Sequence, residues 1–212
     1  MTNIIEALNW RYATKAYDTT KKVSAGDMQT LLESARLAPS SYGLQPWRMV
    51  HVTNPEVRAK LKAAAWEQPQ FTDASDIIVF AVETVFDEAR VDAFIGQVAT
   101  ERGLDAATAL AGYKGMILGT LNSRSQEENI SWAGKQAYIA LGMILETAAL
   151  MNIDATPMEG FDAKQFDEIL GLTSRGLRSV VVCALGYRDA ADSYAQMKKV
   201  RPEMDKMMIE IK

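Results

Sequence analysis

Cysteine and histidine are nearly absent: the chain has one of each, Cys183 and His51, among 212 residues. A single cysteine cannot form an internal disulfide, so the composition favours a reducing compartment. Cys183 lies in the apolar run 180–185, where an inert buried thiol is expected. No G-x-S-x-G motif accompanies His51, so we expect a structural histidine. One histidine and one cysteine match no known metal-ligand spacing, and a carboxylate-only magnesium site stays open.

Long hydrophobic runs and an excess of positive charge are also missing. The longest apolar runs, 77–82 and 180–185, are far shorter than the roughly 20 residues of a membrane-spanning helix. The first ten residues lack the basic and apolar segments of a secretion signal. Lys and Arg number 23 against 27 Asp and Glu, for a net charge of −4, whereas a nucleic-acid partner requires a basic face. We therefore expect a cytoplasmic protein with neither a membrane nor a nucleic-acid partner.

Glycine-rich phosphate loops are absent as well, because neither G-x-x-x-x-G-K-[ST] nor a G-x-G-x-x-G after a strand occurs. A bound phosphate would have to be held by side chains, for which arginine and lysine are suited. Arg11, Lys199 and Arg201 are the candidates, although each alone is more often a solvated surface charge. Together with Lys15, these cations from both chain ends suit a protein that grips an anionic cofactor and leaves the chemistry to it.

Hydrophobic residues make up 48% of the chain, as in an ordinary soluble domain. The tail after Tyr187 carries little core, so it either packs on a second subunit or stays disordered. The mixed pattern predicts an α+β or α/β fold in a single domain, 1–212. Helices are expected over 3–10, 25–37, 55–65, 87–121 (broken near Gly103 and capped again at Asp105), 127–151 and 161–170. Strands are expected over 48–53, 77–83, 153–157 and 178–186, with 206–212 a strand or an arm.

The helix over 127–151 is unusual in its small residues. Glycine in a helix interior costs about 1 kcal/mol relative to alanine, so its glycines need a packing reason. A helix–helix contact, either across a dimer or inside the monomer, would supply that reason, and the sequence does not choose between them. The small residues are Ala133, Gly134, Ala137, Ala140, Gly142 and Ala148.

Two loops offer polar groups to a ligand. The segment 39–47 is stiffened by proline near both ends, and Ser40, Ser41 and Gln45 supply donors and acceptors. The turn 157–160 offers backbone N–H groups, with Gly160 permitting close approach of a flat ring. Each segment could equally be an ordinary connection.

Five segments, in order and spacing, resemble the nitroreductase family, closest to its oxygen-insensitive NAD(P)H nitroreductase and dihydropteridine reductase-like branch. They are RYATKAYD (11–18), APSSYGLQPW (38–47), KQAYIALG (135–142), PMEGFD (157–162) and KKVRPE (198–203). The resemblance implies an α+β fold, a three-layer α-β-α sandwich with a mostly antiparallel central sheet. It also implies a homodimer that exchanges its C-terminal arm and holds FMN non-covalently at two interface sites.

The resemblance assigns site residues by position. Arg11, Lys199 and Arg201 would hold the FMN phosphate, with backbone contacts from Tyr12 and Ala13. Lys15 would reach the N1–C2 carbonyl edge of the flavin and stabilise negative charge there. The other implied contacts are Pro39, Ser40, Ser41 and Gly43 from the second subunit, Gln136 near the ribityl or phosphate group, and Pro157, Met158, Glu159 and Gly160 against one ring face, with the Glu159 or Gly160 N–H donating to N5.

Departures from the family pattern concern the substrate more than FMN. Tyr-Ala after Arg11 replaces a common His-Ser, which removes one hydroxyl contact, and Gly43 stands where asparagine is frequent. Gln68 or Gln70 would serve in place of a frequent Asn and Lys pair. Ile117 and Leu118 occupy positions where aromatic residues often gate the pocket, so we expect them to contact substrate. Residues 87–125 are the expected place for a substrate-covering lid.

The implied activity is ping-pong hydride transfer through flavin N5, from NADH or NADPH to a nitroaromatic, quinone or related electron-poor acceptor. No side chain has to act as a nucleophile, and Lys15 and Glu159 would have supporting roles. The alternatives are a protein that stores or delivers FMN, and pteridine reduction or reductive dehalogenation on the same scaffold. The preferred nicotinamide and the physiological acceptor stay open.

Overall fold

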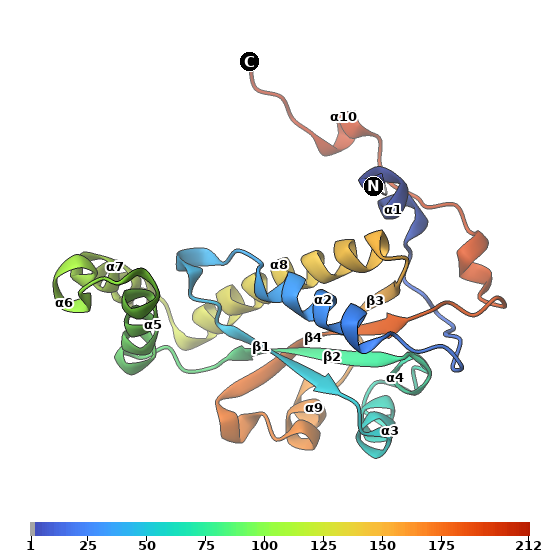
Figure 1. Ribbon diagram of the computed structural model, residues 1–212, viewed down its shortest axis with the longest axis horizontal. Helices are drawn as coiled ribbons and strands as arrows, with labels where there is room; N and C mark the ends of the chain where they lie inside the picture. Colours follow the sequence, from blue (N-terminus) through green and yellow to red (C-terminus); the bar gives the residue numbers. More distant parts are fainter. Residues whose placement is uncertain (1–2) are drawn as a thin grey trace.

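The computed structural model describes residues 3–212 and shows an α+β fold built around one four-stranded sheet (Figure 1). The strands are β1 (Trp47–Val52), β2 (Asp76–Glu83), β3 (Asp154–Met158) and β4 (Leu177–Gly186). The helices are α1 (Ile4–Trp10), α2 (Ala25–Arg36), α3 (Pro55–Ala63), α4 (Gln70–Asp73), α5 (Glu88–Arg102), α6 (Ala106–Ala109), α7 (Ala111–Asn122), α8 (Gln126–Leu150), α9 (Ala163–Leu170) and α10 (Met204–Met207). The strands and longer helices confirm the predicted pattern, whereas α4 was not predicted.

Local signals set the helix ends as the sequence indicates. The Ser24 hydroxyl accepts from the Asp27 N–H at 3.1 Å and begins α2. Pro55 opens α3 behind its cap Asn54, as expected of a residue without an N–H. Gly103, at φ 62°, ends α5, and the Asp105 carboxylate then caps α6. The predicted break is confirmed, and a further break at Leu110 separates α6 from α7.

The sheet has strand order β1-β2-β4-β3, and every neighbouring pair is antiparallel. Successive side chains of β2 and β4 point to opposite faces, so Phe80 and Val181 lie in one apolar cluster and Val79 and Val182 in another. Both faces of these two strands are buried, which explains why their sequences are continuous apolar runs.

Helices cover both faces of the sheet and give a three-layer α-β-α sandwich. Figure 1 shows α2 and α8 on one side and α3 and α9 on the other. Ile144 of α8 and Phe166 of α9 are both 0% exposed and anchor the two outer layers. Truncating such a side chain to alanine costs about 2–5 kcal/mol, so these layers contribute much of the stability of the domain.

Helices α5–α7 form a third apolar cluster at one end of the sheet, opposite the end that carries α1 (Figure 1). Leu44, from the loop before β1, is buried inside this cluster. Phe86 and Trp132 connect it to the main core, with ring centroids 6.0 Å apart. The segment 87–125 therefore has a small core of its own.

Helix α8 divides its small residues between two faces. Ala133, Ala137 and Ala140 are all 0% exposed and pack inside the main core. A Cβ added at Gly134 or Gly142 would meet no described atom within 4 Å. The alanines thus serve packing inside the monomer, and the glycines face open space.

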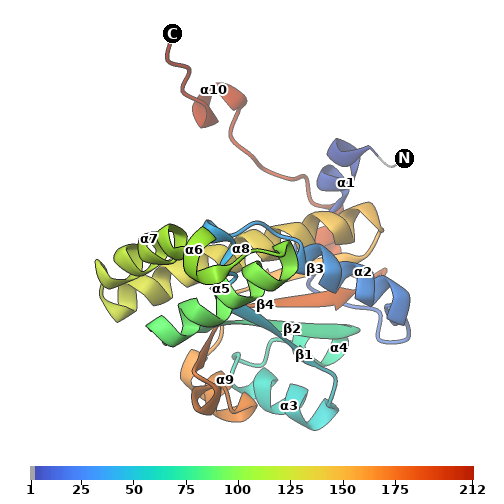
Figure 2. The same ribbon diagram turned by 60° about the vertical axis from the view of Figure 1, so that its left-hand side comes forward.

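The C-terminal residues leave the body of the fold. Residues after Gly186 form no strand, and α10 is the only α-helix described there, so the predicted arm is observed and the alternative strand is not. Figure 2 shows α10 and the C-terminus standing away from the sheet, on the side of α1. The large apolar residues of this C-terminal segment are strongly exposed, with Ile209 at 91% and Ile211 at 92%.

Candidate functional site

The two chain ends meet in one pocket of about 500 Å³. Residues 9–15 form one wall, residues 194–201 form another, and Pro157 joins them from the end of β3. Arg11, Lys15, Lys199 and Arg201 all line it, although up to 190 positions separate them in sequence. The remaining lining residues are Asn9, Trp10, Tyr12, Ala13, Tyr194, Ala195, Met197 and Lys198.

The pocket is cationic, and its lining includes no Asp or Glu. Burial lowers the pKa of Arg11, and the nearby charge of Arg201 lowers it further. Burial, followed by the charges of Arg11 and Arg201, also lowers the pKa of Lys199. Arg11 Nε is buried with no hydrogen-bond acceptor in the described residues. A group of cations that repel one another, one of them with an unpaired donor, fits an anionic ligand.

Asp192 holds the two walls of this pocket together. Its carboxylate accepts from the Tyr12 hydroxyl at 2.9 Å and from the N–H groups of Lys15 and Ala16 at 2.8 and 3.1 Å. The Tyr194 N–H donates to the other carboxylate oxygen at 3.0 Å. Lys199 Nζ donates to the Arg11 carbonyl at 2.5 Å and adds a second link. The sequence prediction missed Asp192, although its position before Ser-Tyr is typical of a capping carboxylate.

A second arginine near the pocket is fully paired and differs from Arg11. Arg188 forms an ion pair with Asp154, which is 3% exposed, with Nη2 and Oδ1 2.6 Å apart. Its guanidinium also stacks on the rings of Trp10 and Tyr12, at 4.1 and 4.6 Å from their centroids. Asp154 in an apolar strand was the missed signal, because a buried carboxylate requires a partner. Arg188 is thus a structural cation.

The loop between α2 and β1 lies at the other end of the sheet, against α7 and α8. The Ser41 N–H donates to Gln136 Oε1 at 2.9 Å, which brings two predicted site residues together. The Tyr42 hydroxyl is 2.8 Å from Thr120 Oγ1, and Tyr42 has a left-handed φ of 58°. Pro39, Ser40, Ser41, Gly43 and Gln136 therefore form a second group, which does not line the cationic pocket of the same chain.

The turn after β3 forms a third group with Gln68. Gln68 Nε2 donates to the Gly160 carbonyl at 2.6 Å, and the Phe161 N–H donates to the Glu159 carbonyl at 2.9 Å. A Cβ on Gly160 would lie 3.3 Å from both Gln68 Nε2 and the Trp66 ring, which explains the glycine. Among the described residues, the N–H groups of Glu159 and Gly160 have no hydrogen-bond acceptor.

Pro157 links this turn to the cationic pocket, since it also lines an apolar pocket of about 490 Å³ beneath α8. Met158 and Glu159 line the apolar pocket together with Leu141 and Val181. Gln70, the other predicted polar contact, is 4% exposed, and its Oε1 has no partner in the described residues. Two of the three predicted groups are thus continuous within one chain.

The two expected substrate residues differ in position. Ile117 is 0% exposed and packs in the core of the α5–α7 cluster, so its side chain shapes α7 instead of facing a cavity. Leu118 is half-buried at the edge of the same cluster. A substrate contact from α7 is therefore better placed at Leu118.

The residues considered for other chemistry have ordinary environments. Cys183 is 0% exposed, and burial raises its pKa to about 12, as expected of an inert thiol. His51 pairs with Asp76 at 2.7 Å beside the sheet. Within residues 3–212, no three His, Cys, Asp or Glu side chains form a metal-binding group. No described helix is long and apolar enough to cross a membrane.

Fold and pocket together define an α+β protein with a cationic, side-chain-lined pocket beside one end of the sheet. The sequence model of the nitroreductase family matches residues 8–187, and the chain belongs to that family. A Staphylococcus saprophyticus protein named "putative NAD(P)H nitroreductase" is 37% identical over 197 residues, with 88% of each chain covered. The "major NAD(P)H-flavin oxidoreductase" of Aliivibrio fischeri is 31% identical, over 93% of this chain and 94% of that protein.

The same fold occurs in a solved structure, that of a "putative nitroreductase in complex with FMN" from Exiguobacterium sibiricum. The two superpose with a TM-score of 0.83 at 22% identity, over 100% of this chain and 98% of that one. The predicted three-layer fold and the predicted family are thereby confirmed.

Proposed function

We propose that this protein is an FMN-dependent NAD(P)H oxidoreductase that reduces nitroaromatics, quinones or related electron-poor acceptors. The observation that carries the proposal is the cationic pocket, in which Arg11, Lys199 and Arg201 converge without a carboxylate among the lining residues. The flavin oxidoreductase of A. fischeri and the FMN complex of E. sibiricum support it by family.

The residues present fit FMN. Arg11, with its buried unpaired Nε, would bind the phosphate together with Lys199 and Arg201. Lys15 lies on the same wall, exposed over the Tyr194 ring at 5.8 Å, and would place a positive charge at one edge of the ring system. The free N–H groups of Glu159 and Gly160 would donate to the other side of the ring.

When bound, FMN supplies the redox chemistry, by taking a hydride from NADH or NADPH and passing it to the acceptor. The protein contributes position, charge and exclusion of water, so no side chain has to act as a nucleophile. This division of roles agrees with the inert thiol of Cys183 and the paired His51.

A homodimer would complete the site. The group around Ser41 and Gln136 lies beside α7, at the opposite end of the sheet from the cationic pocket, so a second copy would have to bring it to the flavin (Figure 1). The open glycines of α8 offer a surface for that copy. The exposed apolar residues of the C-terminal arm would be covered by exchange between subunits.

Helices α5–α7 would serve as the substrate-covering lid. They have an apolar cluster of their own, which meets the main core mainly through Phe86 and Trp132, so a shift of these helices would disturb few core contacts. Leu118 on α7, which is half-buried at the edge of this cluster, would then contact the acceptor.

The visible spectrum of the purified protein tests the proposal. We expect a yellow protein after incubation with FMN, with a stoichiometry of one FMN per chain, that bleaches anaerobically with NADH or NADPH and recovers on addition of a quinone. A protein that binds FMN but does not bleach would favour an FMN storage or delivery role. A protein that stays colourless after incubation with FMN would refute both.

A further inference from the structure

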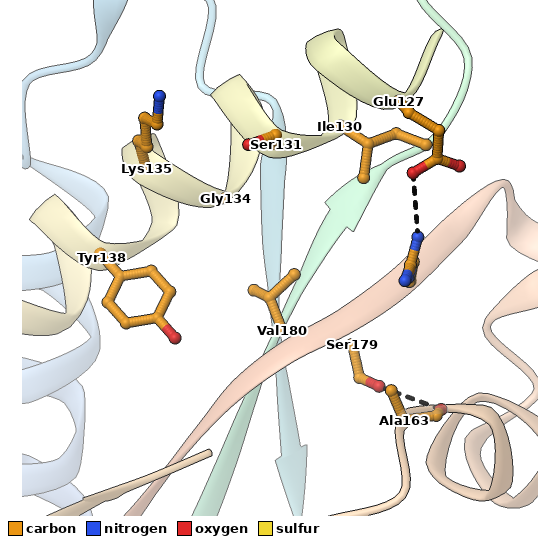
Figure 3. Close-up of a pocket in the computed structure, with 10 residues that line it drawn as sticks. Glu127, Ile130, Ser131, Gly134, Lys135, Tyr138, Ala163, Ser179 and Val180 are labelled. Carbon is orange, nitrogen blue, oxygen red and sulfur yellow. Dashed lines mark hydrogen bonds and ion pairs between the residues drawn. The ribbon is translucent and has the colours of Figure 1, made fainter.

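Tyr138 lies on the outward face of α8, between two pockets. It lines the apolar pocket next to Met158 and a second pocket of about 580 Å³ next to Val180. Figure 3 shows its ring extending from α8 into the second pocket, on the same side of the helix as Gly134. Its hydroxyl donates a hydrogen bond to Glu159 Oε1.

This hydrogen bond completes the set of contacts around the turn 159–160. The Gly160 carbonyl already accepts from Gln68, and the Glu159 carbonyl already accepts from the Phe161 N–H. The hydrogen bond between the Glu159 side chain and Tyr138 is a further contact that restricts the rotation of this turn. Both carbonyls and one carboxylate oxygen are thus engaged, whereas the two N–H groups have no acceptor among the described residues.

We propose that Tyr138 is a positioning residue, which holds the Glu159 carboxylate and so aims the N–H groups of Glu159 and Gly160 at the bound ring. The inference rests on the proposed function and adds to it a residue that never touches the ring itself. It concerns the orientation of two donors, which preorganised sites fix in advance.

A purely structural role fits this bond poorly. Tyr138 is 39% exposed and Glu159 is exposed, and hydrogen bonds between exposed groups add little to the free energy of unfolding. Partial burial, reinforced by Glu159, raises the pKa of Tyr138, so its hydroxyl remains a donor at every working pH.

The first experiment uses the cofactor-free protein. In Tyr138→Phe, the hydrogen-bonded amides of Phe161 and Asp162 should exchange about five- to tenfold faster than in the wild type, the size of one ordinary net intramolecular hydrogen bond. Tyr187→Phe is the matched control, because it removes a hydroxyl for which no hydrogen bond is recorded, and it should exchange like the wild type. Equal exchange in Tyr138→Phe and the wild type would overturn the proposal.

The second experiment uses the FMN-loaded protein. Tyr138→Phe and Glu159→Ala should each slow anaerobic reduction at saturating NADH about five- to tenfold, and the double variant should be no slower than the single ones. The FMN dissociation constant and the melting temperature should stay close to the wild-type values. Additive effects of the two substitutions, or an unchanged reduction rate in Tyr138→Phe, would overturn the inference.

The two proposals fail differently. If wild-type protein binds no FMN or does not bleach, the proposed function fails and the inference fails with it. If the wild type bleaches and the Tyr138 variant bleaches at the same rate, the inference alone is refuted.

Discussion

Arg11→Met separates what the cationic pocket does for FMN from what it does for folding. Arg11 Nε is buried without an acceptor in the described residues, and both burial and Arg201 lower the pKa of the side chain. In the cofactor-free protein the buried charge of Arg11 therefore lowers the free energy of unfolding. A methionine of similar length removes that charge. We expect the free energy of unfolding of the cofactor-free protein to rise by about 1 kcal/mol.

FMN binding should change in the opposite direction. A hydrogen bond between charged partners contributes roughly 1.5–3 kcal/mol, and about 1.4 kcal/mol corresponds to a tenfold change in dissociation constant. Loss of Arg11 should thus weaken FMN binding about 10- to 150-fold, as measured by quenching of flavin fluorescence in a titration. High salt should narrow the difference between variant and wild type.

Riboflavin is the decisive ligand control, because it carries the same ring without the phosphate. Its affinity should be nearly the same for the wild type and for Arg11→Met. Arg175→Met, which removes an exposed arginine that does not line the pocket, should bind FMN like the wild type. An unchanged FMN dissociation constant, or an equal loss for riboflavin, would refute the assignment of this pocket to the phosphate.

Three further predictions concern the same end of the molecule. Lys15→Met should slow reduction at saturating NADH about tenfold and change the FMN dissociation constant less than threefold, and the reverse pattern in stopped-flow and binding data would contradict its placement beside the ring. Folding lowers the pKa of Lys199 below 10.5, so the unfolded chain binds more protons just below that pH, and the free energy of unfolding of the cofactor-free protein should rise with pH there. In Lys199→Met, urea titrations should show a smaller rise of the free energy of unfolding with pH. An equal rise in the variant and the wild type would contradict the assignment of this pH dependence to Lys199. Removal of residues 203–212, which are all exposed, should leave the fold intact and weaken the dimer in sedimentation, whereas an unchanged dimer would exclude arm exchange as its support.

The fold was predictable wherever a local pattern has one physical solution. The apolar runs of β2 and β4 indicate strands buried on both faces, and both lie in the centre of the sheet. Ser24 and Gly171 mark helix ends because an N-cap needs a short side chain with an oxygen acceptor, and glycine adopts the left-handed conformation at a helix C-terminus without steric cost. Such signals involve only a few neighbouring residues, so they can be recognised in the sequence without knowledge of the rest of the structure.

Features with a long-range cause were missed. The chain turns at Trp66 and Glu67, with φ of 52° and 60°, and this unusual pair precedes the unpredicted α4. No glycine or asparagine marks that turn, which leads into the residue, Gln68, that bonds to Gly160. Likewise α6 and α7 separate at Leu110, which carries no helix-breaking residue type. Tertiary contacts decide these conformations, and single residues do not reveal them.

The cationic pocket shows where sequence reasoning about charge reaches its limit. Arg11 and Arg188 are both arginines close to the same pocket, and composition gives them equal claim to an anion. Folding brings Asp154 to Arg188 and pairs it, whereas no lining carboxylate reaches Arg11. The family resemblance also selects Arg11, and the distribution of carboxylates gives a physical reason for that choice, because Asp154 and Asp192 are used to hold the walls. The proposed anion site is therefore distinguished by cations that no lining carboxylate pairs, and only the assembled structure shows which cations these are.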